Sequence, residues 1–542
     1  MTKPWFDQYD PWVLQEIDAD QYGNIVDMLM EAGERFSDKV AFSNFGATKT
    51  YGEVMSLSRD FAAYLQNELG VAKGDRVALM APNMMVFPIA MLGILRAGGV
   101  QVNVNPMYTA RELEHQLNDA DVETIVAFSG ATATLAEVVG NSGIRNVIVA
   151  GLDDLLDIGL PSPPADAGLK DPIAFIDAMS AGSEMELSDV EINGDDLIYL
   201  QYTGGTTGLS KGAMLTHRNL VANVLQFESF AGDYIKPGED VVVTAIPMYH
   251  IFALMVNTLS YSKFGGTNVL ITDPRDMPAF VAEWSKWKVS VFTGVNTLFN
   301  GLLHTPGFAD LDFSTLGFSM GGGAPVQKAV SDKWKEVTGR HIKEGYGLSE
   351  TSPVLTVNPF GMSDFKSSIG VPVPSTDISL RDDAGDEVAQ GERGELCAKG
   401  PQVMKGYWRR EDATAEAMTD DGYFCTGDIA VMDETGFFRI VDRKKDMILV
   451  SGFNVFPNEI EAEVAALKGV LECACIGVPD QKTGEAVKVF IVKSDDSLTV
   501  EAVREHCREY LTGYKVPRHI VFIDELPKST VGKILRRELR DY

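Results

Sequence analysis

The chain has 542 residues, 45% of them hydrophobic, so it can build more than one core without disulfides or metals. Its formal net charge of −30 disfavours nucleic acid as a partner. The first ten residues are polar and acidic rather than typical of a signal peptide, and the longest apolar run, residues 84–95, is too short to span a bilayer. We therefore expect a cytoplasmic protein; peripheral contact with the inner face of a membrane stays open.

Charges and cysteines divide the chain unevenly. Residues 1–441 carry 60 acidic and 31 basic side chains, whereas residues 442–542 carry 17 and 16. A nearly neutral C-terminal part could deliver lysines to an acidic N-terminal part, although an acidic surface suited to high salt explains the imbalance equally well. The five cysteines lack C-x-x-C spacing, which indicates a reducing compartment and argues against a zinc site. Cys473 and Cys475 alternate in a strand-like run, where both are expected to pack as small apolar side chains.

The first third of the chain predicts alternating helices and strands. We expect helices over Asn24–Phe36, over Met84–Arg96 and from a Thr109 capping box to Leu117, and strands over Val77–Met80, Gln101–Val104 and Thr124–Phe128. Residues 151–185, rich in Pro, Gly, Asp and Ala, predict a surface connection. The alternation returns over residues 240–345, which is typical of parallel α/β sheets.

The pattern changes after about residue 365 to short strands and turns, which predicts a small β-rich subdomain over about 365–441. The charged segment Asp442–Asp446 then separates two strand-like runs. About 100 residues follow with their own pattern, including a strand over 487–492 and a helix over 500–511. We interpret the chain as an N-terminal domain (1–441), a hinge (442–446) and a mobile C-terminal domain (447–542); a charged β-turn is the other interpretation of the hinge.

The most informative stretch is residues 199–212. An apolar strand over Asp195–Tyr202 leads into T-G-G-T-T-G-L-S-K, and a helix follows from a Thr216 N-cap to about Phe230. Glycine N–H groups, hydroxyls and a lysine are the chemistry of a phosphate cradle. The loop is not a Walker A motif, because two residues separate Gly208 from Lys211 and a glycine follows the lysine.

The order T-G-G-T-T-G-x-x-K-G resembles the phosphate loop of the acyl-adenylate-forming superfamily, which includes acyl-CoA synthetases, luciferases and adenylation domains. Six further segments resemble the motifs of that superfamily in order and spacing: Pro247–Ala253, Gly321–Pro325, Glu344–Thr351, Tyr423–Asp428, Asp442–Asp446 and Pro527–Ile534. The resemblance covers about residues 45–540. It implies an α/β fold in which a large domain of parallel-rich sheets with a small β-rich subdomain is joined by a hinge to a small α+β domain.

The resemblance also implies substrates and roles. ATP, Mg²⁺ and CoA would serve the activation of a carboxylic acid, first to acyl-AMP and then to acyl-CoA. The β- and γ-phosphates would contact Thr203, Gly204, Gly205, Thr206, Thr207, Gly208 and Lys211. The rest of the nucleotide would contact Gly323, Ala324, Glu344, Gly345, Tyr346, Gly347, Ser349, Asp428 and Arg443. Among these, Tyr346 would offer a flat face to adenine and Asp428 would accept the ribose hydroxyls.

Three residues carry the implied chemistry. Glu350 would bind Mg²⁺, with the Thr203 hydroxyl as a weaker candidate ligand. Lys533 would reach between the substrate carboxylate and the α-phosphate. Lys445 matches the hinge about which the small domain would rotate after adenylation, and Gly452 would then line the pantetheine channel. A homodimer is a further implication.

For the acid, residues 200–208, 421–428 and 442–448 resemble bacterial long-chain fatty acyl-CoA synthetases. An apolar acyl pocket would be lined by His250, Ile251 and Leu254. His250 would shape this pocket rather than act as a base, since a carboxylate needs no deprotonation at pH 7. Leu254 stands where some long-chain members have a gating tryptophan, so the sequence does not identify a gating residue.

Alternatives within the superfamily are a ligase for a medium-chain or aryl acid and an acyl-AMP ligase that loads a carrier protein, the latter disfavoured because the hinge region has no extra insertion. Outside it stand a P-loop NTPase, which the position of Lys211 argues against, and a non-catalytic nucleotide-binding protein. A protein of this last kind would not need Lys533, Glu350 and Asp428 together.

Overall fold

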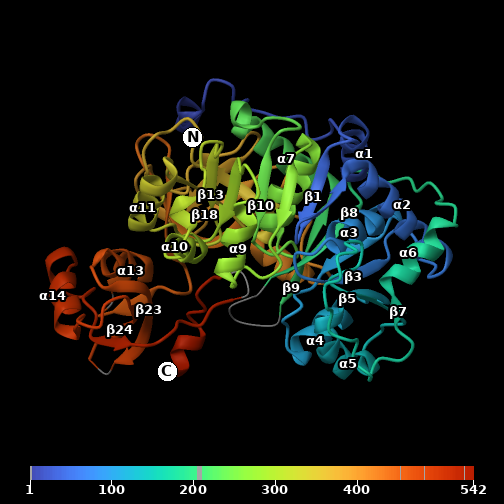
Figure 1. Cartoon of the computed structure of the whole chain (residues 1–542). Helices are drawn as coiled ribbons and strands as arrows, with labels where there is room; N and C mark the ends of the chain where they lie inside the picture. Colours follow the sequence, from blue (N-terminus) through green and yellow to red (C-terminus); the bar gives the residue numbers. More distant parts are fainter. Residues whose placement is uncertain (1–2, 204–209, 452, 481, 530–531) are drawn as a thin grey trace.

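The computed structural model describes residues 3–203, 210–451, 453–480, 482–529 and 532–542. Within these ranges the strands form two large α/β sheets, a four-stranded antiparallel sheet and a five-stranded sheet in a separate C-terminal lobe (Figure 1). The predicted fold class is confirmed.

The seven-stranded sheet has the order β7-β6-β5-β3-β4-β8-β9 and is parallel except for the β8–β9 hairpin. Its strands are β3 (Arg76–Met80), β4 (Val100–Asn103), β5 (Thr124–Phe128), β6 (Asn146–Ala150), β7 (Ile173–Ala174), β8 (Leu197–Thr203) and β9 (Lys211–Thr216). Its helices are α2 (Tyr51–Asn67), α3 (Val86–Arg96), α4 (Ala110–Asp119), α5 (Thr132–Val138) and α6 (Phe175–Ser183). The predicted Thr109 capping box is present, and α3 is a buried helix.

The nine-stranded sheet has the order β16-β15-β14-β13-β12-β10-β11-β1-β2, with a parallel centre from β14 to β1. Its strands are β1 (Val40–Asn44), β2 (Ala47–Thr50), β10 (Val241–Thr244), β11 (Thr267–Leu270), β12 (Val291–Gly294), β13 (Phe318–Gly321), β14 (Ile342–Gly347), β15 (Val354–Val357) and β16 (Val371–Pro372). Associated helices are α1 (Ile25–Arg35), α7 (His217–Ala231), α8 (Ser260–Phe264), α9 (Met277–Trp284), α10 (Asn296–Leu303) and α11 (Lys328–Thr338).

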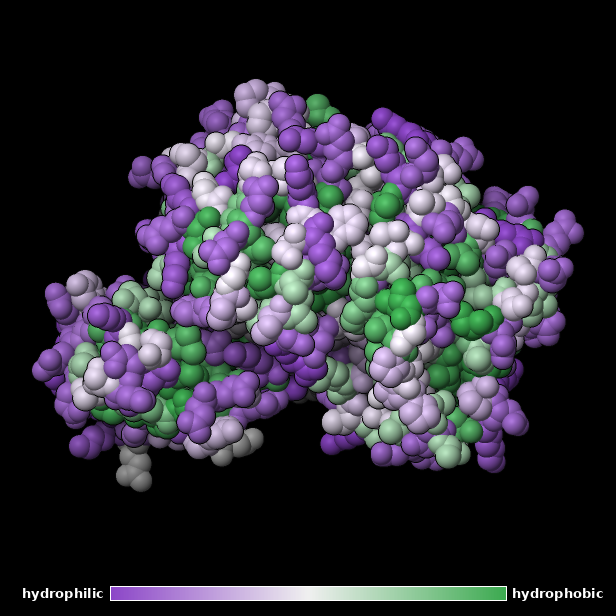
Figure 2. Space-filling view, in the orientation of Figure 1, coloured by the Kyte–Doolittle hydropathy of each residue, from purple (hydrophilic) through white to green (hydrophobic). Residues whose placement is uncertain are grey.

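The third sheet is antiparallel and contains β17 (Asp377–Arg381), β18 (Arg393–Lys399), β19 (Phe424–Met432) and β20 (Phe438–Arg443), with α12 (Glu411–Ala417) nearby in sequence. This sheet is the predicted β-rich subdomain. The C-terminal lobe contains β21 (Ile448–Val450), β22 (Phe453–Val455), α13 (Pro457–Ala466), β23 (Val470–Asp480), β24 (Gly484–Lys493), α14 (Val500–Tyr510) and β25 (His519–Phe522). Figure 2 shows this lobe beside the larger body, with hydrophobic residues across the middle of its visible face and hydrophilic residues around them.

Residues 151–185 are more ordered than the sequence predicts, since they include β7 and α6. Phe175 is fully buried, and its ring centroid lies 5.1 Å from that of Phe61 on α2. A Cβ added to Gly182 would lie 2.0 Å from the carbonyl oxygen of Asp60, so α6 packs directly against the α2 backbone. The expected surface connection is present over residues 151–172, which form no helix or strand and are mostly exposed or half-buried. The expectation was wrong over residues 173–183, because a short apolar stripe is set within the Pro- and Gly-rich segment.

All five cysteines are free, and both Cys473 and Cys475 are buried in the core of the C-terminal lobe, as predicted. In the part of the chain that the structure describes, no helix is both long and apolar enough to cross a membrane.

His217 connects α7 to α1 and makes stability depend on pH. It is 2% exposed, its Nδ1 accepts a hydrogen bond from the Ile25 N–H at 3.3 Å, and burial lowers its pKa from 6.5 to about 4. The unfolded chain therefore binds this proton more tightly than the folded chain does. The stabilisation is complete above about pH 6.5 and is lost as the pH falls toward 4, by on the order of 3 kcal/mol.

Urea denaturation of the wild type and of His217→Asn between pH 4.5 and 7.5 tests this prediction. We expect the free energy of unfolding to depend less on pH in the variant, whose amide oxygen can still accept from the Ile25 N–H. An equally steep dependence in both proteins would show that His217 does not contribute.

Candidate active site

The predicted nucleotide-binding loops lie at the carboxyl edge of the nine-stranded sheet. Gly323 and Ala324 follow β13, and Gly345–Gly347 complete the neighbouring parallel strand β14. Gly323 has a φ of +74°, in the left-handed region that favours glycine. A Cβ at Gly347 would lie 1.7 Å from the Pro353 carbonyl oxygen, so no larger residue fits there. Ligands of open α/β sheets bind at this edge.

Tyr346 and Asp428 come from different sheets and meet at this edge. The Tyr346 hydroxyl donates to Asp428 Oδ2 at 2.5 Å, and the Arg443 Nε lies 3.6 Å from Asp428 Oδ1. Asp428 is only 6% exposed. The structure therefore places an aromatic face, a buried carboxylate and a guanidinium together, which is a suitable set of groups for a nucleoside.

Glu344 supports the loop that follows β13. Its Oε1 accepts a hydrogen bond from the Val326 N–H at 2.9 Å, and burial raises the pKa of this carboxyl to about 8. Ser349 begins a single 3-10 turn, Ser349–Thr351, which also contains Glu350. Direct nucleotide contacts by Glu344 and Ser349 stay predictions, since Glu344 has a structural partner here.

Glu350 is a buried acid held by a tyrosine. It is 8% exposed, its Oε1 accepts a hydrogen bond from the Tyr407 hydroxyl at 2.8 Å, and burial raises its pKa. The Tyr407 ring also faces Lys211, whose Nζ lies 5.1 Å from the ring centroid. Backbone hydrogen bonds fix this segment to β9: Trp408 N–H donates to Gly212 O at 2.8 Å. Tyr407 thus lies between the predicted metal ligand and the predicted phosphate-binding lysine.

Removal of the Tyr407 hydroxyl is expected to slow by about tenfold the acyl-AMP formation that the motifs imply, because a hydrogen bond to a buried carboxylate is lost while the ring stays. Stopped-flow measurement of pyrophosphate release by Tyr407→Phe checks this. The matched control is Tyr423→Phe, which removes a 2.9 Å hydrogen bond to Asp377 in the β-rich subdomain. Equal rates for wild type and Tyr407→Phe would exclude a role for the hydroxyl.

The ends of the predicted phosphate loop are adjacent. Thr203, the last residue of β8, pairs with Lys211, the first residue of β9. His115 of α4 approaches this hairpin, with its Nε2 2.9 Å from the Ser210 carbonyl oxygen. Gly204, Gly205, Thr206, Thr207 and Gly208 lie outside the described residues, as does Gly452.

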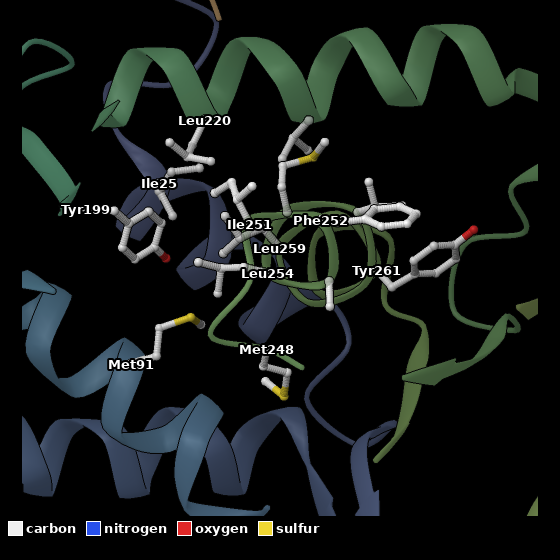
Figure 3. Close-up of a cluster of buried hydrophobic side chains, with 14 of the residues drawn as sticks. Ile25, Met91, Tyr199, Leu220, Met248, Ile251, Phe252, Leu254, Leu259 and Tyr261 are labelled. Atoms are coloured by element: carbon white, nitrogen blue, oxygen red, sulfur yellow. The ribbon is translucent and has the colours of Figure 1, made fainter. Parts of the chain in front are cut away.

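The predicted acyl-pocket residues precede and enter a buried π-helix, Ala253–Leu259, a form of helix often found at functional sites. Figure 3 shows Leu254 lying toward Met91 and Tyr199, with Phe252 on the other side of the helix. Ile251 and Leu254 are 1% and 0% exposed. A Cβ at Gly322 would lie 3.1 Å from the Phe252 ring, so Phe252 packs against the loop after β13. Phe252, in the segment expected to line the acyl pocket, therefore packs beside a nucleotide loop. Acyl binding by Ile251 and Leu254 stays a prediction.

The C-terminal tail docks on the large domain next to the predicted lysine. The Gly532 carbonyl oxygen accepts a hydrogen bond from the Thr297 hydroxyl of α10 at 3.1 Å, and Gly532 has a φ of +76°. Burial, followed by the charge of Arg443, lowers the pKa of Lys533 to about 7. Burial and then the charge of Lys533 lower the pKa of His250 to about 4, so this imidazole is neutral at pH 7. Lys533 thus lies near Arg443, Asp428 and His250.

Within the charged segment Asp442–Asp446, the side-chain contacts pass from the β-rich subdomain to the small domain over three residues. The Lys444 Nζ lies 2.8 Å from Asp383 and 3.2 Å from Glu395, both in the β-rich subdomain. Asp446 instead pairs with Arg536 of the small domain at 3.7 Å. Lys445 stands between these opposite attachments, and residues 444–446 form a turn after β20. The two interpretations of this segment, a charged β-turn and a boundary between domains, are therefore compatible.

Tyr407, Phe252 and Thr297 were not predicted as site residues. Each acts through a contact with a residue distant in sequence, so its local pattern carries no signal. A partial signal was available for Phe252, which lies within the segment expected to line the acyl pocket.

Comparison with known proteins agrees with this geometry. The family described as AMP-binding enzyme matches residues 29–408, and the AMP-binding enzyme C-terminal domain matches residues 459–533. A long-chain-fatty-acid–CoA ligase of Yersinia pestis is 52% identical over 552 aligned residues, covering 100% of this chain and 98% of that protein.

Two solved structures show the same architecture. ATP-bound MatB from Rhodopseudomonas palustris is 30% identical with a TM-score of 0.82, covering 96% of this chain and 98% of that one. The anthranilate CoA ligase AuaEII, in complex with anthranoyl-AMP, is 24% identical with a TM-score of 0.88, covering 97% and 98%, which is a likeness of fold. The chain therefore belongs to the AMP-binding enzymes, the acyl-adenylate-forming superfamily that its motifs resemble.

Proposed function

We propose that this protein is a long-chain fatty acid–CoA ligase that forms acyl-CoA, AMP and pyrophosphate from a fatty acid, ATP and CoA. The observation that carries the proposal is the 52% identity, over the whole chain, to a ligase of that name. The site supports it, because Glu350, Asp428 and Lys533 come from separate segments and gather around the nucleotide loops. Apolar side chains next to these loops suit a substrate without a second charged group.

In the first half-reaction a carboxylate oxygen attacks the α-phosphate of ATP and pyrophosphate leaves, giving acyl-AMP. Asp428 would accept the ribose hydroxyls and Tyr346 would pack against the base. Lys211 and the Thr203 hydroxyl would hold the departing phosphates. Lys533 would stabilise the negative charge that develops between the carboxylate and the α-phosphate, where a compact cation on a flexible stem is suitable.

The residues present also fit Mg²⁺. Glu350 is a buried carboxylate whose pKa is raised by burial, so a cation next to it would compensate a charge that is costly to bury. Carboxylate and hydroxyl oxygens are suitable ligands, and Glu350 with the weaker candidate Thr203 would hold the ion. When bound, Mg²⁺ would neutralise charge on the phosphates as pyrophosphate departs.

The second half-reaction needs the same acyl carbonyl to be reached by CoA. Lys533 and its tail would block that approach in this arrangement, so we propose that the small domain rotates about Lys445 after adenylation. The thiolate then attacks the acyl carbonyl and AMP leaves, with Gly452 lining the channel. The opposite attachments of Lys444 and Asp446 support a pivot between them. Homodimer formation is a further proposal that rests on the resemblance. Peripheral contact with a membrane surface, where fatty acids partition, is a separate proposal.

The substrate class is tested by CoA-dependent AMP release from purified protein with ATP and Mg²⁺, comparing palmitate, oleate, octanoate and 4-coumarate. We expect kcat/KM to be highest for palmitate and oleate. Preference for octanoate or 4-coumarate would keep the mechanism and overturn the assignment of a long-chain acid.

A further inference from the structure

Asp442 has its backbone in the large domain and its side chain in contact with the small domain. Its backbone lies in β20 and pairs with Ile429 of β19, so it is part of the sheet of the β-rich subdomain. Its side chain is 0% exposed. A carboxylate is rarely buried to this extent unless specific partners compensate its charge.

These partners lie in the small domain. Asp442 Oδ2 accepts a hydrogen bond from the Asn458 N–H, in the first turn of α13, at 3.0 Å. Oδ1 lies 3.5 Å from an Nη of Arg536. The first turn of a helix favours a negative charge, and the guanidinium adds a full positive charge. Asp442 Oδ1 also accepts from the N–H of the next residue, Arg443, at 2.7 Å.

Arg536 is itself fixed within the small domain. Its Nε and one Nη lie 3.0 and 2.7 Å from the two carboxylate oxygens of Glu461 on α13, and it also donates to Asn458. Arg536 follows Lys533 by three residues in the same tail. One arginine therefore joins α13, the tail that carries Lys533, and the carboxylate of a strand in the large domain.

A rotation about Lys445 would separate these groups. Residues up to Lys444 stay with the β-rich subdomain through Asp383 and Glu395, whereas residues from Asp446 onward move with Arg536. Asp442 would then lose Asn458 and Arg536. These contacts are specific to the arrangement that places Lys533 at the nucleotide site.

We propose that Asp442 and Arg536 form an interdomain latch that positions Lys533 for adenylation and opens for the thioester step. This inference rests on the proposed two-step function. Neither residue contacts the reacting atoms, so both are positioning residues. Their loss should affect the two half-reactions unequally, whereas a general loss of folding would affect both.

The test measures each half-reaction in single turnover, with the acid that the wild type uses best. Acyl-AMP formation by Asp442→Asn is expected to fall by about tenfold or more, because a neutral amide forms no ion pair with the guanidinium. Thioester formation from preformed acyl-AMP and CoA is expected to stay within about twofold of wild type. Arg536→Lys, which keeps the charge but loses the forked geometry, should show the same asymmetry. The double variant should lose little more than either single variant.

The control is Arg518→Gln, which removes an ion pair with Asp480 at 2.8 Å within the small domain, away from the hinge, and should leave the ratio of the two rates unchanged. Equal losses in both half-reactions, or no loss in either, for Asp442→Asn and Arg536→Lys would overturn the latch. If Asp442→Asn does not fold, the two rates measured for Arg536→Lys alone test the latch. A wild type that forms no acyl-AMP would instead refute the proposed function.

Discussion

Replacement of Lys533 by alanine is expected to lower acyl-AMP formation by about two to three orders of magnitude, while thioester formation from preformed acyl-AMP is largely unaffected. The reason is geometric. The Gly532–Thr297 hydrogen bond holds the tail on α10, and Lys533 lies close enough to Arg443 and Asp428 for their charges to alter its pKa. The variant removes the cation that would stabilise charge in the first transition state, and the second transition state would form with this tail elsewhere.

The measurement is a pair of rapid-quench experiments, one starting from ATP and fatty acid and one from acyl-AMP and CoA. The control is Lys528→Ala in the same tail, where Lys528 pairs with Glu472 at 2.8 Å within the small domain. Lys528→Ala should keep both rates close to those of wild type. Equal losses in both half-reactions for Lys533→Ala would exclude a role confined to adenylation.

Lys445→Pro is expected to have the opposite effect, preserving acyl-AMP formation and stopping the thioester step. Proline fixes φ near −65° and also restricts the residue before it, so it removes rotational freedom at the point where the chain passes from one domain to the other. Acyl-AMP should then accumulate on the enzyme to about one equivalent, with very slow release of acyl-CoA.

Lys445→Ala is the matched control, because it removes the same side chain and keeps backbone freedom. Both half-reactions should remain fast in that variant. Unchanged multiple turnover in Lys445→Pro would show that the pivot lies elsewhere. Similar loss of thioester formation in both variants would show that the lysine side chain, rather than backbone rotation, matters.

Sequence predicted the fold best where local physics decides structure. Thr109 and Thr216 cap helices through hydrogen bonds to residues three positions away, so both helix starts were correct. The strand over Thr124–Phe128 agrees with β5 at both ends. Helix α6 could not be predicted, because it is stabilised by packing on α2, and the sequence does not show which surface its apolar stripe will contact.

The candidate site also contains residues that the sequence could predict and residues that it could not. Tyr346, Asp428 and Lys533 lie within recognisable motifs, and the structure brings them together. The contribution of Tyr407 depends on a hydrogen bond to Glu350, 57 residues away, and that of Asp442 on Arg536, 94 residues away. Such contacts are set by how the sheets and domains assemble. The π-helix that contains Leu254 also has no sequence signature of its own.

The most direct test of the two-step account is a single-turnover experiment with labelled palmitate, ATP and Mg²⁺ in the absence of CoA, followed by addition of CoA. The account predicts about one equivalent of enzyme-bound palmitoyl-AMP and of pyrophosphate in the first phase. CoA should then convert that adenylate to palmitoyl-CoA with release of AMP. Formation of ADP and phosphate, or of palmitoyl-CoA without an acyl-AMP that forms first, would contradict it.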